Sequence, residues 1–298
     1  MQATLVIPTL NAAALLPGLL DAAAAQSAPP EGVLVIDSSS DDGTADLARA
    51  RGCTVVTIDR AAFDHGATRA LALDHCSTQA VLFMTQDALP ADGQVFARLL
   101  GPLQHDPVAA TYARQVARAD ATPPEAYLRL HNYPAQPQAA RTAADIHRLG
   151  VRAFFLSNVA AAYRRDALEA VGRFPRHTIM NEDMLTAARL LRAGFAVQYV
   201  ADACVLHSHR YRPGQHLRRY FDIGVFMTDH AEELGATPGG GEGLAFVKGQ
   251  LRHVPASWWP RCVAEAGAKW VGYQLGRRYR SLPVRWRRAL SMHKAHWR

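Results

Sequence analysis

The chain has few cysteines, and the four it has stand far apart among its 298 residues. Cys53, Cys76, Cys204 and Cys262 show no paired spacing, which argues against a zinc site and against a disulfide framework. We therefore expect a protein of the reducing cytoplasm. Long apolar runs are also missing, because no segment approaches the roughly 20 residues that span a bilayer. We expect no secretion signal, since the amino terminus leads directly into the strand-like run Ala3 to Ile7.

Acidic residues are absent from the last part of the chain. Nine lysines and arginines follow Glu265 without one acidic residue, whereas the part up to Glu265 holds slightly more acidic than basic residues. A nucleic-acid-binding protein more often carries its basic surface on the folded body, so we expect no nucleic-acid partner. In the basic tail, Trp286, Leu290 and Trp297 fall near one helical face, which is typical of a helix in a membrane interface. The alternative is a helix that packs on the protein or on a second copy in a homodimer.

Strand and helix patterns alternate in the first hundred residues. Such alternation predicts an α/β fold with a mostly parallel central sheet flanked by helices. Apolar runs of strand length occur at 4–8, 33–37, 53–58 and 80–84.

The organisation changes further along the chain. Residues 120–152 are irregular and rich in proline, which predicts a long excursion packed over the cleft. Strand and helix patterns return before 225. We therefore place one α/β domain over 1–225, followed by a helical, basic carboxy-terminal extension over 226–298. Within this extension, Pro238 to Gly241 has the composition of a flexible break.

Polar residues follow three of the predicted strands. Asp87 comes just after the apolar run 82–84, Asp37 ends the second strand, and Thr9 and Asn11 end the first. The carboxyl ends of parallel strands share one edge, where open α/β sheets bind their ligands. An aspartate there can accept the imide N–H of a uracil or thymine ring. The alternative is ordinary turn and helix-cap chemistry, for which Asp, Ser and Thr are common.

Several motifs resemble family 2 glycosyltransferases of the GT-A fold, a Rossmann-like α/β fold, and in particular the bacterial rhamnosyltransferase branch. They occur in the expected order over roughly residues 3 to 225. The matching segments are Val6–Asn11, Val35–Thr44, Phe63–Arg69, Thr85–Ala88, Ser157–Arg165, Asn181–Asp183 and His207–His209.

This resemblance implies an inverting transfer of a sugar, with L-rhamnose from its thymidine diphosphate donor (dTDP-rhamnose) favoured. The acceptor would be a hydroxyl of a growing polysaccharide or lipid-linked saccharide, and the protein would work in the cytoplasm or at the inner face of the cell membrane. An alternative is a nucleotide-sugar-binding protein that has lost catalysis. A nucleotidyltransferase is disfavoured, because residues 10–14 lack a glycine-rich basic loop.

The resemblance also implies catalytic and metal-binding residues. Asp183 would be the general base, with Glu182 beside it, because a helix amino terminus favours an ionised carboxylate. The alternative is that both residues only complement the helix dipole. Asp87 and His207 would hold a divalent cation, Mg²⁺ or Mn²⁺. The family typically has Asp-x-Asp where this chain has Thr85-Gln86-Asp87, so one anionic ligand is missing. A structural role is the alternative for His207.

The remaining site residues implied by the resemblance bind the donor or shape the acceptor site. Arg69 would reach the diphosphate with its forked guanidinium, and Gly66 would let the backbone approach the donor closely. The competing interpretation of Arg69 is an exposed position on the protein surface. Arg114 would shape the sugar or acceptor subsite. The full donor-binding set is Pro8, Thr9, Asn11, Asp37, Ser39, Gly66, Arg69, Gln86, Asp87 and Arg218.

Overall fold

The computed structural model describes residues 1–235 and 242–297, and these form two compact units. The sheet unit comprises Met1–Val116, Tyr133–His177 and Glu182–His207, and the helical unit comprises Ala117–Asn132, Thr178–Asn181 and the described residues from Ser208 onward. The sequence predicted a boundary at 225, which falls inside a helix in the structure. The predicted break at Pro238 to Gly241 lies outside the described residues.

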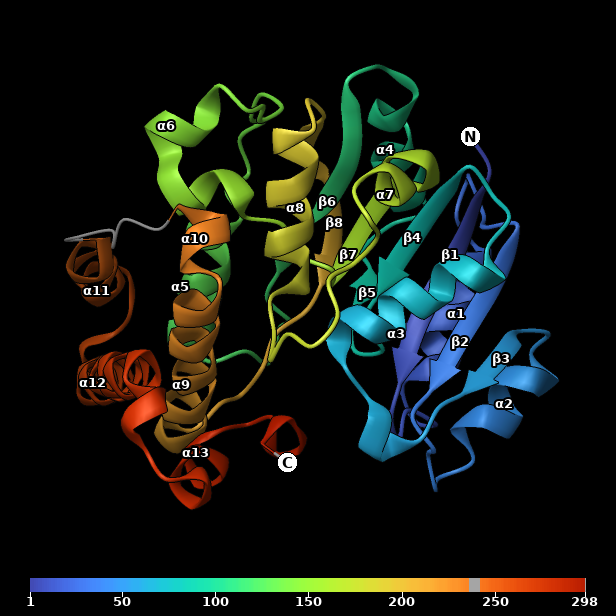
Figure 1. The fold of residues 1–298 in the computed structure, drawn as a ribbon. Helices are drawn as coiled ribbons and strands as arrows, with labels where there is room; N and C mark the ends of the chain where they lie inside the picture. Colours follow the sequence, from blue (N-terminus) through green and yellow to red (C-terminus); the bar gives the residue numbers. More distant parts are fainter. Residues whose placement is uncertain (236–241, 298) are drawn as a thin grey trace. The chain divides into compact units, whose positions relative to one another are not determined.

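One eight-stranded sheet forms the centre of the sheet unit (Figure 1). The strand order is β3-β2-β1-β4-β7-β6-β8-β5, and the four strands β3, β2, β1 and β4 run parallel. The antiparallel strand β7 joins them to the parallel pair β6 and β8. The strands are β1 (Ala3–Thr9), β2 (Gly32–Asp37), β3 (Thr54–Thr57), β4 (Ala80–Met84), β5 (Leu89–Pro90), β6 (Val108–Val116), β7 (Ala160–Arg164) and β8 (Ala196–Leu206).

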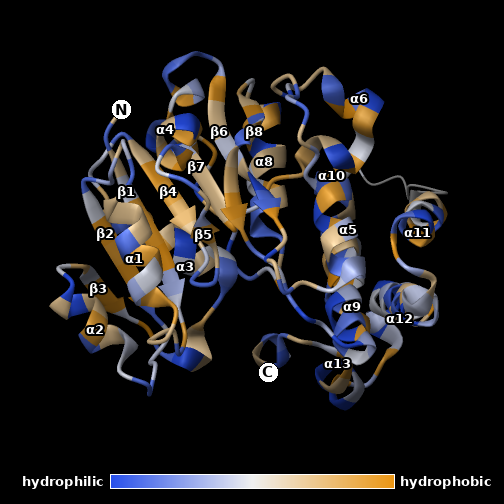
Figure 2. Cartoon of the chain, turned by 180° about the vertical axis from the view of Figure 1, so that it is seen from behind, coloured by the Kyte–Doolittle hydropathy of each residue, from blue (hydrophilic) through white to orange (hydrophobic). Residues whose placement is uncertain are grey.

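Helices cover both faces of this sheet, as Figures 1 and 2 show from opposite sides. The helices of the sheet unit are α1 (Leu16–Ala24), α2 (Thr44–Ala50), α3 (His65–Ala72), α4 (Val95–Leu100), α6 (Asp145–Leu149), α7 (Arg165–Ala170) and α8 (Glu182–Arg192). The α/β fold with a mostly parallel central sheet is thereby confirmed. The predicted excursion over 120–152 is divided, because its first part belongs to the helical unit and its second part to the sheet unit.

The alternation of side chains along the strands explains the two layers. Successive residues of a strand point to opposite faces. Leu5 and Leu82 face the side where α1, α2 and α4 pack, and they belong to one core with Leu16 and Phe96. Phe83 points to the side of α3 and α8 and packs edge to face against Tyr163 and Phe174. The central strands β1, β2 and β4 are accordingly apolar on both faces (Figure 2).

The helical unit is built around α9 (Pro213–Asp229) and α12 (Trp259–Arg277). Its other helices are α5 (Pro123–Asn132), α10 (Ala231–Leu234), α11 (Glu242–His253) and α13 (Val284–Leu290). Glycines allow α9 and α12 to pack closely, since a Cβ added to Gly272 or Gly276 would lie 2.2 or 2.1 Å from a carbonyl oxygen of α9. Across residues 1–235 and 242–297, no helix combines the length and apolar character needed to cross a bilayer.

The last residues of the chain pack on α9. Asp222 is fully buried, and its carboxylate accepts hydrogen bonds from the backbone N–H groups of Met292 (2.8 Å) and His293 (3.3 Å). Trp297 is only 8% exposed and packs against Phe221. The sequence placed Trp297 on a membrane-facing helical surface with Trp286 and Leu290. This expectation is corrected, because α13 ends at Leu290 and Trp297 faces the protein interior.

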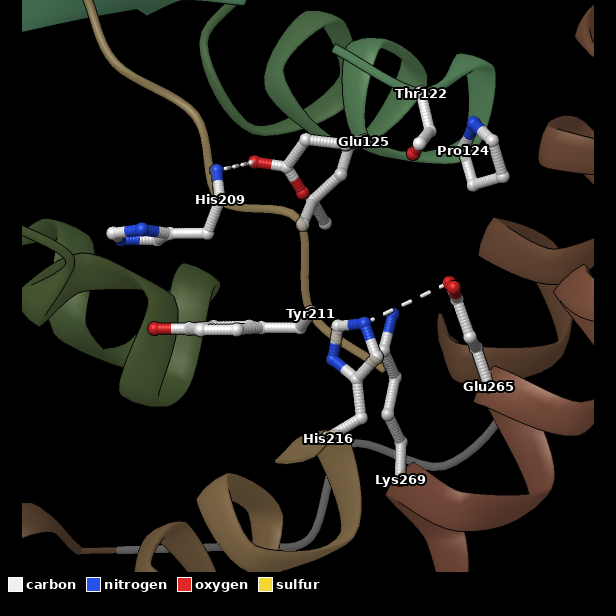
Figure 3. A pocket seen from close by; sticks show the side chains of 9 residues that line it. Thr122, Pro124, Glu125, His209, Tyr211, His216, Glu265 and Lys269 are labelled. Carbon is white, nitrogen blue, oxygen red and sulfur yellow. Dashed lines mark hydrogen bonds and ion pairs between the residues drawn. The ribbon is translucent and has the colours of Figure 1, made fainter. Parts of the chain in front are cut away.

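A polar cluster lies inside the helical unit between α5, α9 and α12 (Figure 3). His216 on α9 is 6% exposed, and its Nε2 lies 3.7 Å from Oε2 of Glu265 on α12. Glu265 also accepts a hydrogen bond from Arg261 at 2.8 Å. Burial lowers the pKa of His216, and the positive charges of Lys269 and nearby arginines lower it further, to about 4. The imidazole is therefore neutral at physiological pH.

Candidate functional site

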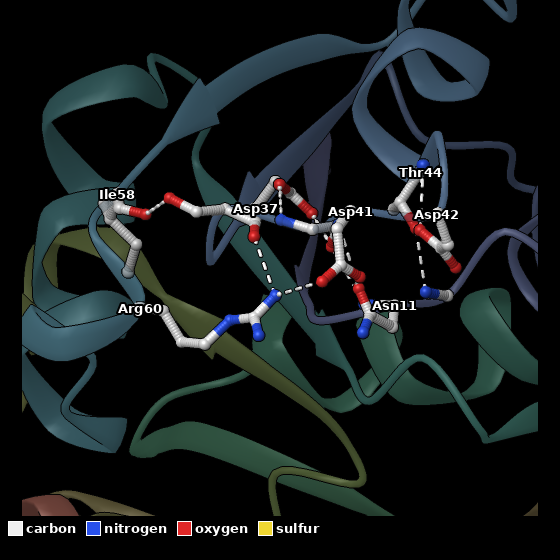
Figure 4. A network of polar contacts seen from close by, with 10 residues as sticks. Asn11, Asp37, Asp41, Asp42, Thr44, Ile58 and Arg60 are labelled. Atoms are coloured by element: carbon white, nitrogen blue, oxygen red, sulfur yellow. Dashed lines mark hydrogen bonds and ion pairs between the residues drawn. The ribbon is translucent and has the colours of Figure 1, made fainter.

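The loops that follow β1 and β2 are joined by side-chain hydrogen bonds (Figure 4). Asp37 ends β2 and is 1% exposed. Its carboxylate accepts hydrogen bonds from Thr9 Oγ1 (2.9 Å) and from the backbone N–H and the hydroxyl of Ser40 (2.8 and 2.5 Å). Pro8 lies beside Ile36 in the parallel register of β1 and β2. Asp37 thus organises the loop in which the sequence places a nucleotide base.

Two non-glycine residues of these loops adopt left-handed backbone conformations. Asn11 has a φ of 51° and Ser39 a φ of 54°. Such conformations cost free energy and persist where surrounding contacts fix them. Asn11 Oδ1 accepts the backbone N–H of Asp41 at 3.1 Å, and Ser39 is held by its hydroxyl bond to the carbonyl of Ile58 and by Arg60 (Figure 4). Strained residues held in this way cluster at ligand sites.

Gln86 ties the end of β4 to the loop after β1. Its Oε1 accepts the backbone N–H of Leu10 at 2.8 Å, and its Nε2 donates to the Leu10 carbonyl at 3.0 Å. The sequence assigned Gln86 to donor binding, whereas the structure uses both ends of its amide to hold the backbone of Leu10. Asp87 follows directly, with 32% of its side chain exposed.

His207 lies opposite Asp87, just beyond the end of β8. Its Nε2 is 3.4 Å from Asp87 Oδ2, and its side chain is 4% exposed. Its Nδ1 is 2.9 Å from Gln115 Oε1. The Gln115 Nε2 atom donates to Tyr133 Oη (2.6 Å) and Ser157 Oγ (2.9 Å), which leaves Oε1 facing His207. Oε1 therefore accepts the Nδ1–H of His207, and in the neutral imidazole this tautomer places the Nε2 lone pair toward Asp87.

Asp183 lies in the first turn of α8, where the helix dipole favours a negative charge. Its Oδ2 accepts a hydrogen bond from the backbone N–H of Asn158 at 3.2 Å, and its Oδ1 accepts one from the backbone N–H of the next residue, Met184, at 2.8 Å. The side chain is partly exposed, so a proton donor can reach it. Burial nevertheless raises the pKa of Asp183, and the charge of Glu182 raises it further, to about 7. A carboxylate with this pKa is suited to general base catalysis near neutral pH.

Glu182, one residue earlier, is buried and paired. Its Oε1 lies 3.0 Å from Arg69 Nη1 and accepts a hydrogen bond from Asn158 Nδ2, also at 3.0 Å. Tyr163 in turn donates to Asn158 Oδ1 at 2.6 Å. Burial raises the pKa of Glu182, but Arg69, His65 and Asn158 outweigh this effect and hold the pKa below its usual value. Glu182 is therefore an ionised neighbour of Asp183.

Arg69 and Gly66 on α3 have roles inside the protein. The sequence directed the Arg69 guanidinium to a diphosphate, but Arg69 is 4% exposed, pairs with Glu182 and donates to the carbonyl of His65. Arg69 thereby supplies the positive partner that the buried carboxylate of Glu182 requires. A Cβ on Gly66 would lie 1.7 Å from the carbonyl oxygen of Pro175, so the close approach made by Gly66 is to the loop before α8.

A chain of contacts joins the three aspartates that the sequence placed at one edge. Asp37 accepts a hydrogen bond from Thr9. The next residue, Leu10, is hydrogen-bonded to Gln86, which directly precedes Asp87. On the other side of Asp87, the Thr85 N–H donates to the carbonyl of Val159 at 3.1 Å. Val159 follows Asn158, whose N–H binds Asp183. These contacts link the segments that carry Asp37, Asp87 and Asp183 within the sheet unit.

The two remaining predicted arginines lie in different units. Arg114 is on β6 at a shift in register against β8, a place where strands redirect their side chains. Arg218 is on α9 of the helical unit, where it lines an open hollow with Arg212, Gly214 and Gln215. The sheet unit therefore holds every predicted site residue apart from Arg218.

Sequence reasoning gave no positioning role to Gln115 or Asn158. The subsite prediction named Arg114 but not the next residue, Gln115, and Asn158 was included only as part of a motif. Their partners lie 92 and 24 residues away in the chain, so spacing does not reveal these contacts. The available signal was the motif Ser157-Asn158 itself, a polar pair that precedes the apolar run of β7.

Comparisons with known proteins agree with this geometry. Residues 4–172 match the family model of glycosyl transferase family 2. The chain is 39% identical to an O-antigen chain rhamnosyltransferase, RfbN, of Salmonella typhimurium, with 100% of this chain and 96% of the relative covered. It is 38% identical to the O-antigen chain rhamnosyltransferase WbaN of Salmonella anatum, over 99% of this chain and 95% of the relative.

Solved structures share the fold at lower identity. A mannosyltransferase from Pyrobaculum calidifontis, in complex with GDP-Man and Mn²⁺, matches with a TM-score of 0.60 and 21% identity over 99% of this chain and 84% of that chain. Glucosyl-3-phosphoglycerate synthase from Mycobacterium tuberculosis matches with a TM-score of 0.53 and 18% identity over 80% of this chain and 82% of that chain. These likenesses show a GT-A fold.

Proposed function

The chain belongs to glycosyl transferase family 2, and we propose that it transfers L-rhamnose from dTDP-rhamnose to a hydroxyl of a growing O-antigen type of polysaccharide, with inversion at the anomeric carbon. The GT-A fold and the family establish the glycosyltransferase. The names of the two Salmonella relatives, which align over nearly their full lengths, support rhamnose as the sugar.

We assign the proton transfer to Asp183. Its carboxylate removes the proton of the acceptor hydroxyl while that oxygen attacks the anomeric carbon, and the diphosphate leaves from the opposite face of the sugar. The observation that supports this assignment best is the pairing of Glu182 with Arg69 directly beside Asp183. Arg69 keeps the buried carboxylate of Glu182 ionised. Burial and the negative charge of Glu182 then raise the pKa of Asp183 to about 7. Two adjacent acids thereby acquire different roles.

The pair Asp87 and His207 fits a divalent cation. With its Nδ1–H donated to Gln115, His207 directs a nitrogen lone pair toward a carboxylate oxygen 3.4 Å away. Mg²⁺ prefers oxygen ligands alone, so a nitrogen ligand beside the carboxylate favours Mn²⁺, with phosphate oxygens completing the site. A bound cation would neutralise charge on the departing diphosphate. Thr85 stands where the family has a second acid, so we assign Asp87 and His207 as the protein ligands and leave the other positions to the donor and to water.

We propose that the donor is held by the loops after β1 and β2. Asp37 and Ser39 lie beside the base and ribose, where Thr9 and Asn11 fix the loop geometry. The acceptor is presented on a lipid carrier at the inner face of the cell membrane. Arg114, on β6 where the register against β8 shifts, contributes to the sugar or acceptor subsite.

The test measures sugar transfer and donor binding separately. The full chain is incubated with Mn²⁺ and dTDP-rhamnose, UDP-glucose or GDP-mannose, and transfer to a panel of alkyl glycosides is followed by chromatography. We expect turnover with dTDP-rhamnose and a loss of roughly 10²–10⁴-fold in Asp183→Asn, with donor binding retained in calorimetry. Exposed Asp46 on α2 supplies the matched control, Asp46→Asn, which should leave turnover unchanged.

The same experiment separates the alternative, a nucleotide-sugar-binding protein without catalysis. The absence of a second acid at Thr85 is the observation that favours this alternative. Donor binding without turnover in the parent protein would support it and contradict the proposal. Equal turnover in the parent and in Asp183→Asn would contradict the assignment of the base but not the enzyme, and preference for another donor would contradict rhamnose alone.

A further inference from the structure

The helical unit leaves one face of α12 uncovered, and we propose that this face docks on an anionic lipid bilayer. We call the set Trp259, Val263, Trp270 and Val271 the α12 outer face. The inference locates the membrane contact of the proposed function on the molecule, and it rests on surface geometry rather than on the sugar or the catalytic residues.

The opposite face of α12 is already used for packing on α9. Gly272 and Gly276 approach the backbone carbonyls of Leu217 and Phe221 so closely that no Cβ could be added there without displacement. Glu265 lies on the same side and is 4% exposed. At 100° per residue these three positions lie within a sector of roughly 40°. The α12 outer face points away from this contact.

The outer face is apolar and strongly exposed. Trp259, Val263, Trp270 and Val271 are 47%, 58%, 66% and 39% exposed. Helical geometry places Trp259, Val263 and Trp270 within a sector of about 40°, and Val271 lies about 80° outside this sector. Soluble helices normally bury an apolar stripe of this kind. Two tryptophans on one exposed helix face require a partner surface that accepts aromatic rings.

Exposed apolar residues are concentrated in the helical unit. Of the large hydrophobic residues exposed in the described part of the chain, the sheet unit contributes only Met1, Leu10 and Leu15. The helical unit contributes all the others, although it is the smaller of the two. Four of these residues lie on α12, and the others are divided among α5, α11 and α13. Scattered exposed side chains are normal, whereas several on one helix mark an interaction site.

Charge identifies the partner. Arg277 lies five helical turns beyond Trp259 and so continues the same stripe, and both Arg277 and Arg278 are exposed. No acidic residue follows Glu265, which is itself buried and paired with Arg261. Tryptophan prefers the interface of a bilayer, and arginines beside it bind anionic headgroups. An apolar aromatic stripe that ends in positive charge therefore fits an anionic bilayer.

A second copy of the chain is a poorer fit. In a two-fold symmetric dimer the same patch faces itself, so the interface would gather the arginines of both copies without adding an acidic partner. The exposed residues Arg285 and Arg288 of α13 add further positive charge to the same unit. Like charges across an interface oppose association, whereas anionic lipid neutralises them.

The test compares the full chain with surface variants in sedimentation with vesicles. One set of vesicles contains phosphatidylcholine alone, and the other also contains roughly 30% of the anionic lipid phosphatidylglycerol. We expect binding only to the anionic vesicles, and a loss of partitioning of roughly tenfold or more in the double variant Trp259→Ser, Trp270→Ser. Arg277→Gln and Arg278→Gln should each weaken binding about fivefold.

Two controls keep the result interpretable. Leu130→Ser removes an equally exposed apolar side chain of the helical unit outside α12, and it should bind like the parent. Thermal unfolding is measured for every variant. It should be the same for the Arg277, Arg278 and Leu130 variants, whereas the double tryptophan variant also loses the hydrogen bond from the Trp259 indole to the Leu251 carbonyl. Undiminished vesicle binding by the double tryptophan variant would overturn the proposal. The proposal would also be overturned if this variant converted a dimer into a monomer without changing vesicle binding, because the α12 outer face would then join two copies. No sugar donor is present, so either result leaves the proposed reaction untouched.

Discussion

Asp183 and Glu182 are adjacent acids with opposite environments. Burial raises the pKa of Asp183, the charge of Glu182 raises it further to about 7, and the N–H groups of Asn158 and Met184 limit the rise. The base must be ionised to accept a proton. We therefore expect kcat/KM to rise with pH through an apparent pKa near 7.

Glu182→Gln tests the origin of this pKa. The variant removes the neighbouring negative charge and leaves the positive charge of Arg69 uncompensated, and both changes favour ionised Asp183. The acid limb of the kcat/KM profile should therefore move to lower pH, although burial still holds the pKa above that of a solvated carboxylate. Glu169→Gln, an exposed ion-pair partner of Arg173, is the control. An acid limb that stays in place in Glu182→Gln would contradict the electrostatic assignment.

Gln115 orients His207, which we propose as a metal ligand. Its amide accepts the Nδ1–H of His207, which leaves the Nε2 lone pair directed toward Asp87. Gln115→Leu removes this acceptor, and we expect the affinity for Mn²⁺ to fall by roughly 10–100-fold in calorimetry.

A rescue variant separates positioning from general damage to the fold. Gln115→Glu keeps an oxygen that can accept the Nδ1–H, so it should retain Mn²⁺ binding close to that of the parent. Gln79→Leu, at an exposed position before β4, should do the same. If Gln115→Leu bound Mn²⁺ as tightly as the parent, the proposed orientation of His207 would play no part in metal binding.

Residue types and motifs identified part of the site from the sequence. Asp87, Asp183 and His207 were proposed because each belongs to a motif of the resemblance, and an acid in a first helical turn would alone indicate no more than the helix dipole. Arg69 was assigned differently, since a sequence does not show which carboxylate a guanidinium meets. The positioning role of Gln115 was missed because it depends on an amide orientation fixed by Tyr133 and Ser157.

At the scale of secondary structure, α3 packs against the loop that leads into α8. Gly66 is the contact point, where an added Cβ would lie 1.7 Å from the Pro175 carbonyl oxygen and 3.3 Å from Glu182 Cβ. Gly66→Ala should therefore shift this loop and destabilise the protein by about 1–3 kcal/mol, as overpacking does. Denaturant unfolding measures the change.

Gly18 on α1 is the matched control for this substitution. A Cβ added there meets nothing within 4 Å, and its backbone has no positive φ. Gly18→Ala should be neutral or stabilising, because alanine has the higher helix propensity. Equal stability of Gly66→Ala and the parent would show that the loop before α8 adapts without cost.

Strands were predicted well where both faces are buried. The runs that became β1, β2 and β4 are continuous apolar segments bounded by polar residues, the pattern of a parallel central strand. The antiparallel direction of β7 was not predicted. Its alanine-rich run Ala160–Arg164 carries little strand signal, and its direction is set by pairing with β4, which is distant in the chain.

At the scale of the whole chain, the two units depend on different interactions. The sheet unit has a continuous apolar core, whereas the helical unit contains the buried polar cluster around His216 and Glu265. Sequence composition indicated a basic, helical end of the chain but not this division. The unit draws its segments from three separate stretches of sequence, and such long-range packing leaves no periodic pattern.

His216 gives the helical unit a characteristic dependence on pH. Its pKa is about 4 in the folded protein and about 6.5 in an unfolded chain, so the unfolded state binds the proton more tightly. Stability is therefore fully present above pH 6.5 and is lost as the pH falls from 6.5 to 4, by up to about 3 kcal/mol from this one group. His216→Asn removes the titration, and the difference in unfolding free energy between variant and parent should change over this range alone. Calorimetry of the full chain measures it, and carboxylates common to both proteins cancel in the difference. Identical pH dependence of the two proteins would mean that His216 gains a proton in the folded state as readily as in the unfolded chain.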